Sequence, residues 1–112
     1  MCGIAGAENQ ETVENLIEEM RHRGNSCQTK KAEGFSLGHV LHSVVGDLEQ
    51  PIGDNSFLSA NCEIYNWKEI NNRYGWNTEN DAETLLKLLD KKGTKALEEV
   101  DGIYAFAWIN NG

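Results

Sequence analysis

The clearest pattern in the first quarter of the chain is helical. In the stretch ETVENLIEEM, residues 11–20, the apolar positions are Val13, Leu16, Ile17 and Met20. They recur at i, i+3, i+4 and i+7, which is the spacing of one face of an α-helix. The basic residues of RHRG and then Gly24 follow, and both are typical of a helix C-terminus. The pattern predicts an amphipathic helix over 11–20.

The second half of the chain predicts two more helices. The shorter one is indicated by residues at helical spacing, namely Trp67, Ile70 and Tyr74. The longer one has its apolar positions at Ala82, Leu85, Leu86 and Leu89. The sequence NDAE in front of it can cap a helix N-terminus, and Gly93 behind it can end one. One further helical turn is favoured by Ala96, Leu97 and Val100.

Four stretches have the apolar and β-branched composition of strands, and they cover residues 2–7, 35–45, 57–60 and 103–109. The second reads as one strand or as two joined at a kink, and the third ends at Asn61. The polar segment 25–33 is predicted to be a loop.

The resulting order is strand, helix, strands, helices, strand. This order predicts an α+β fold in which the strands are pooled into sheets. The last stretch, IYAFAWI over 103–109, is expected to be buried, and a long apolar strand normally needs neighbours on both sides. We therefore expect either that the polypeptide is cut short, as part of or shortened from a longer protein, or that its sheet is completed by something else. An exposed edge would invite pairing with a second copy of the chain.

Composition narrows the class of protein. Residues 1–112 are enough for one small domain, and no repeat or linker divides them. With 10 basic and 18 acidic residues the net charge is −8, which argues against nucleic acid or an anionic membrane as partner. No apolar run is long enough to span a bilayer, and no signal peptide is apparent. Three cysteines without a CxxC or HExxH pattern indicate neither a disulfide framework nor a metal site, and suggest the reducing cytoplasm.

The first residues, MCGIAG, allow two interpretations. In one, Cys2 is a small buried residue at the start of a strand. In the other, Met1 is removed and Cys2 carries both a thiol and a free α-amine. Position 2 alone favours the first interpretation, so the rest of the chain must decide between them.

Six segments occur in an order that resembles a known family. They are MCGIAG, RHRG, LGHVLHSVVG, NCEIYN, NDAET and GIYAFAW. The chain resembles the glutaminase domain of class II glutamine amidotransferases, and most of all the N-terminal domain of glutamine-hydrolysing asparagine synthetases. The resemblance spans nearly the whole chain. It implies all or part of the four-layer αββα sandwich of N-terminal nucleophile hydrolases.

The resemblance also implies a catalytic centre. Cys2, freed of Met1, would attack the glutamine amide, and its own α-amine, with a pKa near roughly 7.7–8.0, would serve as the base. Asn61 and Cys62 align with the asparagine and glycine of the family motif NGEIYN. The Asn61 side chain and the Cys62 backbone N–H would then form the oxyanion hole. The alternative for Asn61 is a turn residue at a strand end.

Three further residues are implied on the substrate side. Asp81 would hold the α-ammonium group of glutamine, while Glu63 and His39 match family residues near the substrate. Each has a simpler alternative. Asp81 fits a helix N-cap, although Asn80 can cap while Asp81 faces the pocket. Glu63 fits a solvated turn, and His39 fits ordinary sheet packing, as does His42.

Departures from the family pattern are equally specific. Leu41 stands where the family has the arginine that grips the glutamine α-carboxylate, and a leucine cannot pair with a carboxylate. Arg21 or Arg23 of RHRG could compensate. Cys62 replaces a glycine, so it is strained if that position needs a positive φ, and otherwise narrows the pocket. A thiol there could also form a reversible disulfide with Cys2.

Three functions follow. The first is glutamine hydrolysis that supplies ammonia to an asparagine-synthetase-like amidation, with no cofactor in this domain and with ATP and magnesium confined to a synthetase partner. The second is an amidase of the same fold acting on a different amide, for which Leu41 would be a change of specificity. The third is a catalytically silent domain that binds a synthetase domain or subunit.

Overall fold

The computed structural model describes residues 2–24, 26–32, 34–41 and 50–110. Within these residues, two antiparallel sheets and three α-helices make a mixed α+β fold, as predicted. The strands are β1 (Gly3–Ala7), β2 (Ser26–Ala32), β3 (Phe35–Leu41), β4 (Ser56–Ile64) and β5 (Gly102–Asn110). The helices are α1 (Gln10–Glu19), α2 (Trp67–Tyr74) and α3 (Asp81–Lys92), with 3-10 turns η1 (Arg21–Arg23) and η2 (Gly93–Glu98).

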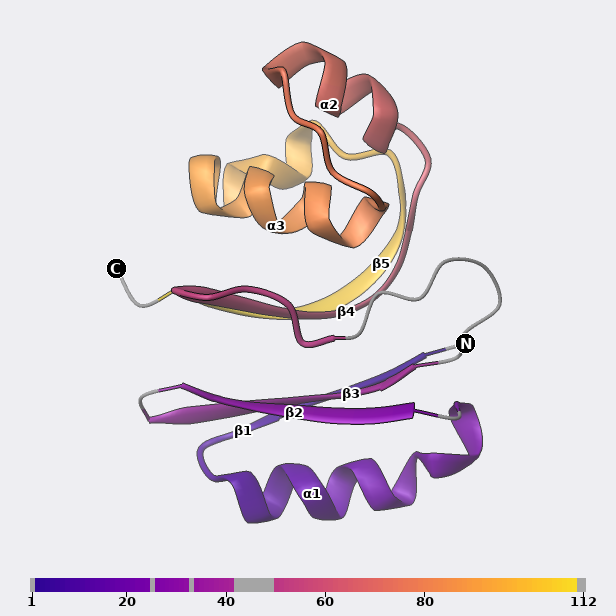
Figure 1. The fold of residues 1–112 in the computed structure, drawn as a ribbon, viewed down its shortest axis with the longest axis vertical. Helices are drawn as coiled ribbons and strands as arrows, with labels where there is room; N and C mark the ends of the chain where they lie inside the picture. The colour runs from indigo at the N-terminus through magenta and orange to yellow at the C-terminus, as the bar shows by residue number, and fades with distance from the viewer. Residues whose placement is uncertain (1, 25, 33, 42–49, 111–112) are drawn as a thin grey trace.

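The elements stack in the order seen in Figure 1. The three-stranded sheet has the order β1-β3-β2 and carries α1 on one face. Its other face is turned to the two-stranded β4-β5 sheet, whose far side is covered by α2 and α3. No helix of the described residues combines the length and the apolar character needed to cross a membrane.

The close packing of α1 against its sheet depends on Gly38. A Cβ atom at Gly38, in the middle of β3, would lie 2.7 Å from Val13 and 2.8 Å from Ile17 of the helix. Both of these helix residues are buried against the sheet, as the periodicity predicts. Leu16, expected on the same face, is instead 42% exposed, because the helix contacts the narrow sheet along a stripe too thin to include it.

The second core lies between β4 and α3. It is formed by seven buried residues, Leu58, Ala60, Ile70, Leu85, Leu88, Leu89 and Ala96. The ends of α3 are those predicted from sequence: the Asn80 side chain accepts a hydrogen bond from the Glu83 N–H at 3.0 Å, and Gly93 follows the last turn at φ 62°. The left-handed conformation at Gly93 is one that glycine adopts without a steric cost.

Two strand predictions are wrong. The predicted loop over 25–33 contains β2, which pairs with β3 from Ser26↔Leu41 to Ala32↔Phe35. It is an outer strand whose Lys30 and Lys31 are exposed, so it lacks the apolar alternation of a covered strand. The third strand does not end at Asn61, since β4 continues to Ile64 in unbroken register with β5. Residues 42–45, expected to continue the 35–45 strand, lie outside the described residues.

The last strand exists as predicted but is not buried. Within the described residues β5 pairs with β4 alone, and its other edge has no strand beside it. Ile103 is 68% exposed and Ala105 is also exposed, although both lie on the face turned toward the three-stranded sheet. Residues 103–109 therefore include apolar side chains that the described residues leave exposed.

Candidate active site

The alternation of side chains along the strands gathers several predicted residues between the two sheets. Ser59 of β4 points to the three-stranded sheet, because its hydroxyl donates to the Gly38 carbonyl at 2.6 Å. Asn61 and Glu63, two and four residues further, lie on the same face of β4. On β3, His39 points back toward β4, and Leu41 shares its face.

Cys2 lies immediately before β1, at the edge of this interlayer space. It is half-buried, and its carbonyl oxygen accepts a hydrogen bond from Arg23 Nε at 3.1 Å. A Cβ at Gly3 would lie 3.0 Å from Met20 Sδ, so the tight contact that glycine relieves there is with Met20. Continuing the β1–β3 register one step beyond Gly3↔Val40 places Leu41 opposite Cys2. Leu41, at the position where the family has an arginine, therefore lies beside Cys2, the candidate nucleophile.

Asn61 and Cys62 lie within β4, not at its end, so the interpretation of Asn61 as a terminal turn residue is wrong. Leu58 and Ala60 direct their backbone polar groups away from β5, Leu58 to Ile52 and Ala60 to Gln50 and His39. The register of β4 with β5 has no bulge. By the same alternation the Cys62 N–H projects from this edge of β4.

The Cys62 thiol lies on the opposite face of the strand from the Asn61 side chain, toward α3. Its Sγ is 3.9 Å from Asp81 Oδ2. Burial, followed by the charges of Asp81 and Cys2, raises the pKa of the Cys62 thiol to about 12, so the thiol is protonated at neutral pH. No described residue other than glycine has a positive φ, so Cys62 is not strained where the family has glycine. Cys27 and Cys62 are free thiols.

Asp81 is the first residue of α3. The N-cap of this helix is Asn80, as predicted, so the Asp81 side chain is not required as the cap. Its Oδ2 accepts the backbone N–H of Ile64 at 2.9 Å. This bond ties the N-terminus of α3 to the end of β4, two residues beyond Cys62. The helix N-terminus also favours a negative charge at this point.

The other candidate residues differ in setting. His39 is fully buried, and its Nε2 is 2.8 Å from the Ala60 carbonyl oxygen. Burial lowers the pKa of His39 below its ordinary value of 6.5, with the Ala60 hydrogen bond acting in the opposite direction, so the ring is neutral. Glu63 is exposed. Arg21 pairs with Glu18 at 2.6 Å on the surface, which leaves Arg23 as the arginine of RHRG that contacts Cys2. His42 lies outside the described residues.

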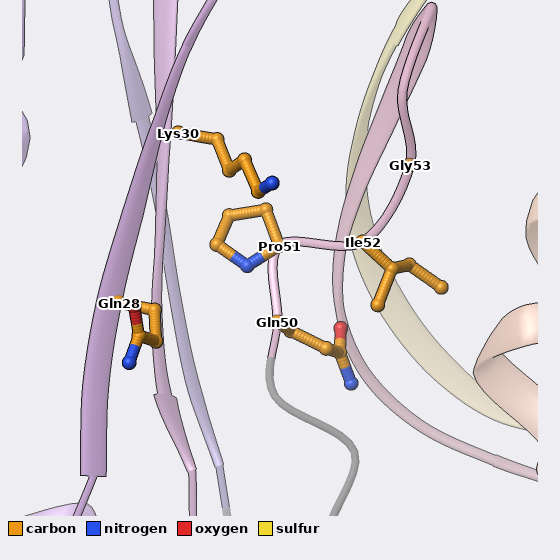
Figure 2. Close-up of a pocket in the computed structure, with 6 residues that line it drawn as sticks. All are labelled: Gln28, Lys30, Gln50, Pro51, Ile52 and Gly53. Atoms are coloured by element: carbon orange, nitrogen blue, oxygen red, sulfur yellow. The ribbon is translucent and has the colours of Figure 1, made fainter.

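Besides the Arg23 contact with Cys2, the sequence also indicated no role for Gln50 in this region. Gln50, buried at the start of the segment before β4, accepts the Ala60 N–H on Oε1 at 2.8 Å. Figure 2 shows its side chain extending toward β4 beside a pocket of about 290 Å³. That pocket is lined by Gln28, Lys30, Gln50, Pro51, Ile52 and Gly53, and so does not include the candidate catalytic residues. The pairing of Gln50 with Ala60 is not visible in any local pattern.

Among the described residues no group of three or more histidine, cysteine, aspartate and glutamate side chains is placed to hold a metal ion.

Comparison with known proteins adds independent information. A family model described as a glutamine amidotransferase domain matches residues 1–111. Glutamine-hydrolyzing asparagine synthetase B of Escherichia coli (strain K12) is 32% identical over 126 residues, which cover 96% of this chain and 23% of that protein. A putative glutamine-hydrolyzing asparagine synthetase 2 of Methanocaldococcus jannaschii is 27% identical over 124 residues, covering 87% of this chain and 24% of that protein. The chain thus spans about a quarter of the length of these relatives.

The setting of Cys62 predicts that its thiol is chemically silent in the folded protein. With the pKa raised from 9.0 to about 12, alkylation by iodoacetamide at pH 8 should be roughly 1000-fold slower than in the unfolded chain, because only the thiolate reacts. Peptide mass spectrometry separates Cys62 from Cys2 and Cys27. Asp81→Asn is the control and should leave the reaction slow, because burial is the largest cause of the shift. Equal rates in folded and unfolded protein would contradict this assignment.

Proposed function

Because the chain belongs to the glutamine amidotransferase domain family, as found in asparagine synthetase-like proteins, we propose that it hydrolyses the side-chain amide of glutamine with Cys2 as nucleophile. The ammonia would supply an amidation carried out by a synthetase domain or subunit. The observation that supports this proposal is that Asp81 contacts Cys62 and Ile64 at one edge of β4, while Cys2 acts electrostatically on Cys62, the residue after Asn61. ATP and magnesium are assigned to the synthetase partner, and none to this domain.

We further assign the fold to the αββα sandwich of N-terminal nucleophile hydrolases. The order of layers in Figure 1 supports this assignment, with α1 outside one sheet and α2 and α3 outside the other. In such a sandwich, a nucleophile immediately before β1 faces the space between the two sheets. The glutaminase-like unit is taken to include the whole of 1–112.

The proposed reaction begins once Met1 has been removed, because a peptide bond to Met1 would abolish the basicity of the Cys2 nitrogen. The free α-amine takes the thiol proton, and the thiolate sulfur bonds to the amide carbon of glutamine. The tetrahedral intermediate expels its nitrogen as ammonia, which carries away the transferred proton, and leaves a thioester. Water then attacks the thioester, releasing glutamate and restoring the thiol. The hydrogen bond from Arg23 to the Cys2 carbonyl fixes the nucleophile's backbone during these steps.

The oxyanion is assigned to two donors of β4, the Asn61 side-chain amide and the Cys62 N–H. The Asn61 side chain lies on the face turned to the three-stranded sheet, and the Cys62 N–H projects from the strand edge. Replacement of the family glycine by Cys62 is compatible with this role, because the thiol is directed toward α3 and the backbone is unstrained.

On the substrate side, Asp81 is assigned to the α-ammonium group. Its Oδ2 holds the Ile64 N–H, and Oδ1 is assigned to the ligand. Glu63, exposed and two residues beyond Asn61 on the same face, is assigned a place at the rim of the site.

The central test is glutamine hydrolysis by the chain with Met1 removed, measured as released ammonia and glutamate. Cys2→Ala should reduce kcat by about 10⁴-fold or more, because the nucleophile and its attack are lost. Cys27→Ala removes a half-buried free thiol on β2 and should retain the wild-type rate. If Cys2→Ala kept its activity, Cys2 would be excluded from the mechanism. If the wild-type chain turned over no amide at all, the silent-domain interpretation would replace this proposal.

A second candidate function is favoured by Leu41, which lies opposite Cys2 where the family has a carboxylate-binding arginine. The substrate would then be an amide without an α-carboxylate. Leu41→Arg should lower the KM for glutamine by roughly tenfold or more if the rest of the pocket is built for glutamine, since a charge-assisted pair contributes about 1.5–3 kcal/mol.

Leu41→Met, which keeps the size but adds no charge, is the control for this substitution. An unchanged KM in Leu41→Arg would mean that the carboxylate is held elsewhere, and Arg23 is the described cation in contact with Cys2. A wild-type preference for an uncharged amide over glutamine would establish the second function.

A further inference from the structure

We propose that His39 and Gln50 are positioning residues that clamp the backbone of Ala60 and thereby hold the two oxyanion donors, Asn61 and Cys62, in place. The inference rests on the proposed function, because it concerns the same site. It assigns His39 a role through the backbone of β4 in place of direct contact with the substrate.

The clamp acts at an edge of β4 where the described residues provide no neighbouring strand. On one side β4 is held by β5 along its whole length. On the other side, residues 50–110 of the described structure supply a backbone partner at Leu58, which exchanges two hydrogen bonds of 2.9 Å with Ile52. At Ala60, side chains take over: Gln50 Oε1 accepts the N–H and His39 Nε2 donates to the carbonyl, both at 2.8 Å. Both backbone polar groups of this one residue are therefore held by side chains.

The position of the clamp relative to the donors is what links it to catalysis. The Ala60 carbonyl belongs to the same planar peptide unit as the Asn61 nitrogen. A hydrogen bond that fixes this carbonyl therefore also fixes the orientation of the peptide plane that precedes the Asn61 Cα. The Cys62 N–H projects from the same edge two residues later. Beyond it, Asp81 holds the Ile64 N–H at 2.9 Å. The edge that carries the Cys62 donor is thus anchored on both sides, by His39 and by Asp81.

His39 is suited to hold rather than to react. It is 0% exposed, and its Nε2 faces a carbonyl oxygen, which can only accept, so the ring proton is on Nε2. Its Nδ1 has no hydrogen-bond partner among the described residues. A neutral donor in a buried setting makes a strong hydrogen bond to the carbonyl without placing a positive charge beside the Asn61 amide.

Simple stabilisation of the sheet packing is the competing explanation, and Ser59 separates the two. Its hydroxyl makes the neighbouring bond between the same sheets, to the Gly38 carbonyl at 2.6 Å, and it is equally buried. It does not touch the backbone polar groups of Ala60. Ser59→Ala is therefore a matched control that removes one inter-sheet hydrogen bond without releasing the clamp.

The experiment measures kcat and KM for glutamine, together with the melting temperature, on the chain with Met1 removed. His39→Leu should lower kcat by about 10- to 100-fold with KM within about twofold, because the oxyanion donors act in the transition state and not in ground-state binding. His39→Gln keeps an N–H at a similar reach and should recover most of the lost kcat. Ser59→Ala should lower the melting temperature and leave kcat unchanged. If His39→Leu does not fold, Gln50→Leu removes the other half of the clamp and should show the same loss of kcat.

The outcomes are distinguishable. Loss of kcat in His39→Leu or Gln50→Leu, with rescue by His39→Gln and none of the loss in Ser59→Ala, supports the clamp. A lower melting temperature with unchanged kcat in all the variants overturns it and leaves the proposed function standing. A wild-type chain without glutamine turnover overturns the proposed function, and the clamp with it.

Discussion

A hydrogen bond between the buried ring of His39 and the carbonyl of Ala60 ties the two sheets together at the candidate site. This contact fixes the register of β3 against β4 at Ala60. Every candidate residue depends on that register. Shifting β4 by one residue against β3 would turn the Asn61 side chain away from the three-stranded sheet and bring Cys62 in its place.

The same register explains how the chain tolerates one departure from its family and why the other matters. Cys62 adds a side chain on the α3 face of β4, away from the interlayer space, so a thiol in place of glycine leaves the face that carries Asn61 unchanged. Leu41 is different, since the β1–β3 ladder leads directly from it to Cys2. The first substitution alters the face of β4 that contacts Asp81, whereas the second alters the neighbourhood of the proposed nucleophile.

Elements with local signals could be predicted from the sequence. The helix α3 has both its cap in NDAE and its end at Gly93, and α1 has its apolar stripe. The strand β2 could not be predicted, because this outer strand is only partly covered and its sequence, with exposed Lys30 and Lys31, has no apolar alternation. The burial of β5 was predicted wrongly for the converse reason: its composition is that of a covered strand, but the described residues pair it only on one edge.

The candidate site follows the same division. Cys2, Asn61 and Asp81 could be proposed because each lies in a motif of fixed order. The contacts that hold them could not, because Arg23 to the Cys2 carbonyl and Gln50 to the Ala60 N–H join a side chain to a backbone group distant in sequence. Such contacts depend on tertiary geometry, and no periodic pattern in the sequence indicates them.

The most direct test is the intact mass of the chain before and after incubation with a glutamine-like diazoketone, which traps a nucleophilic cysteine. The expected result is a mass lower by one methionine, and then a single adduct that peptide mapping places on Cys2. Retention of Met1, or an adduct on Cys27 or Cys62 with Cys2 unmodified, would contradict the central claim that the N-terminal cysteine is the nucleophile.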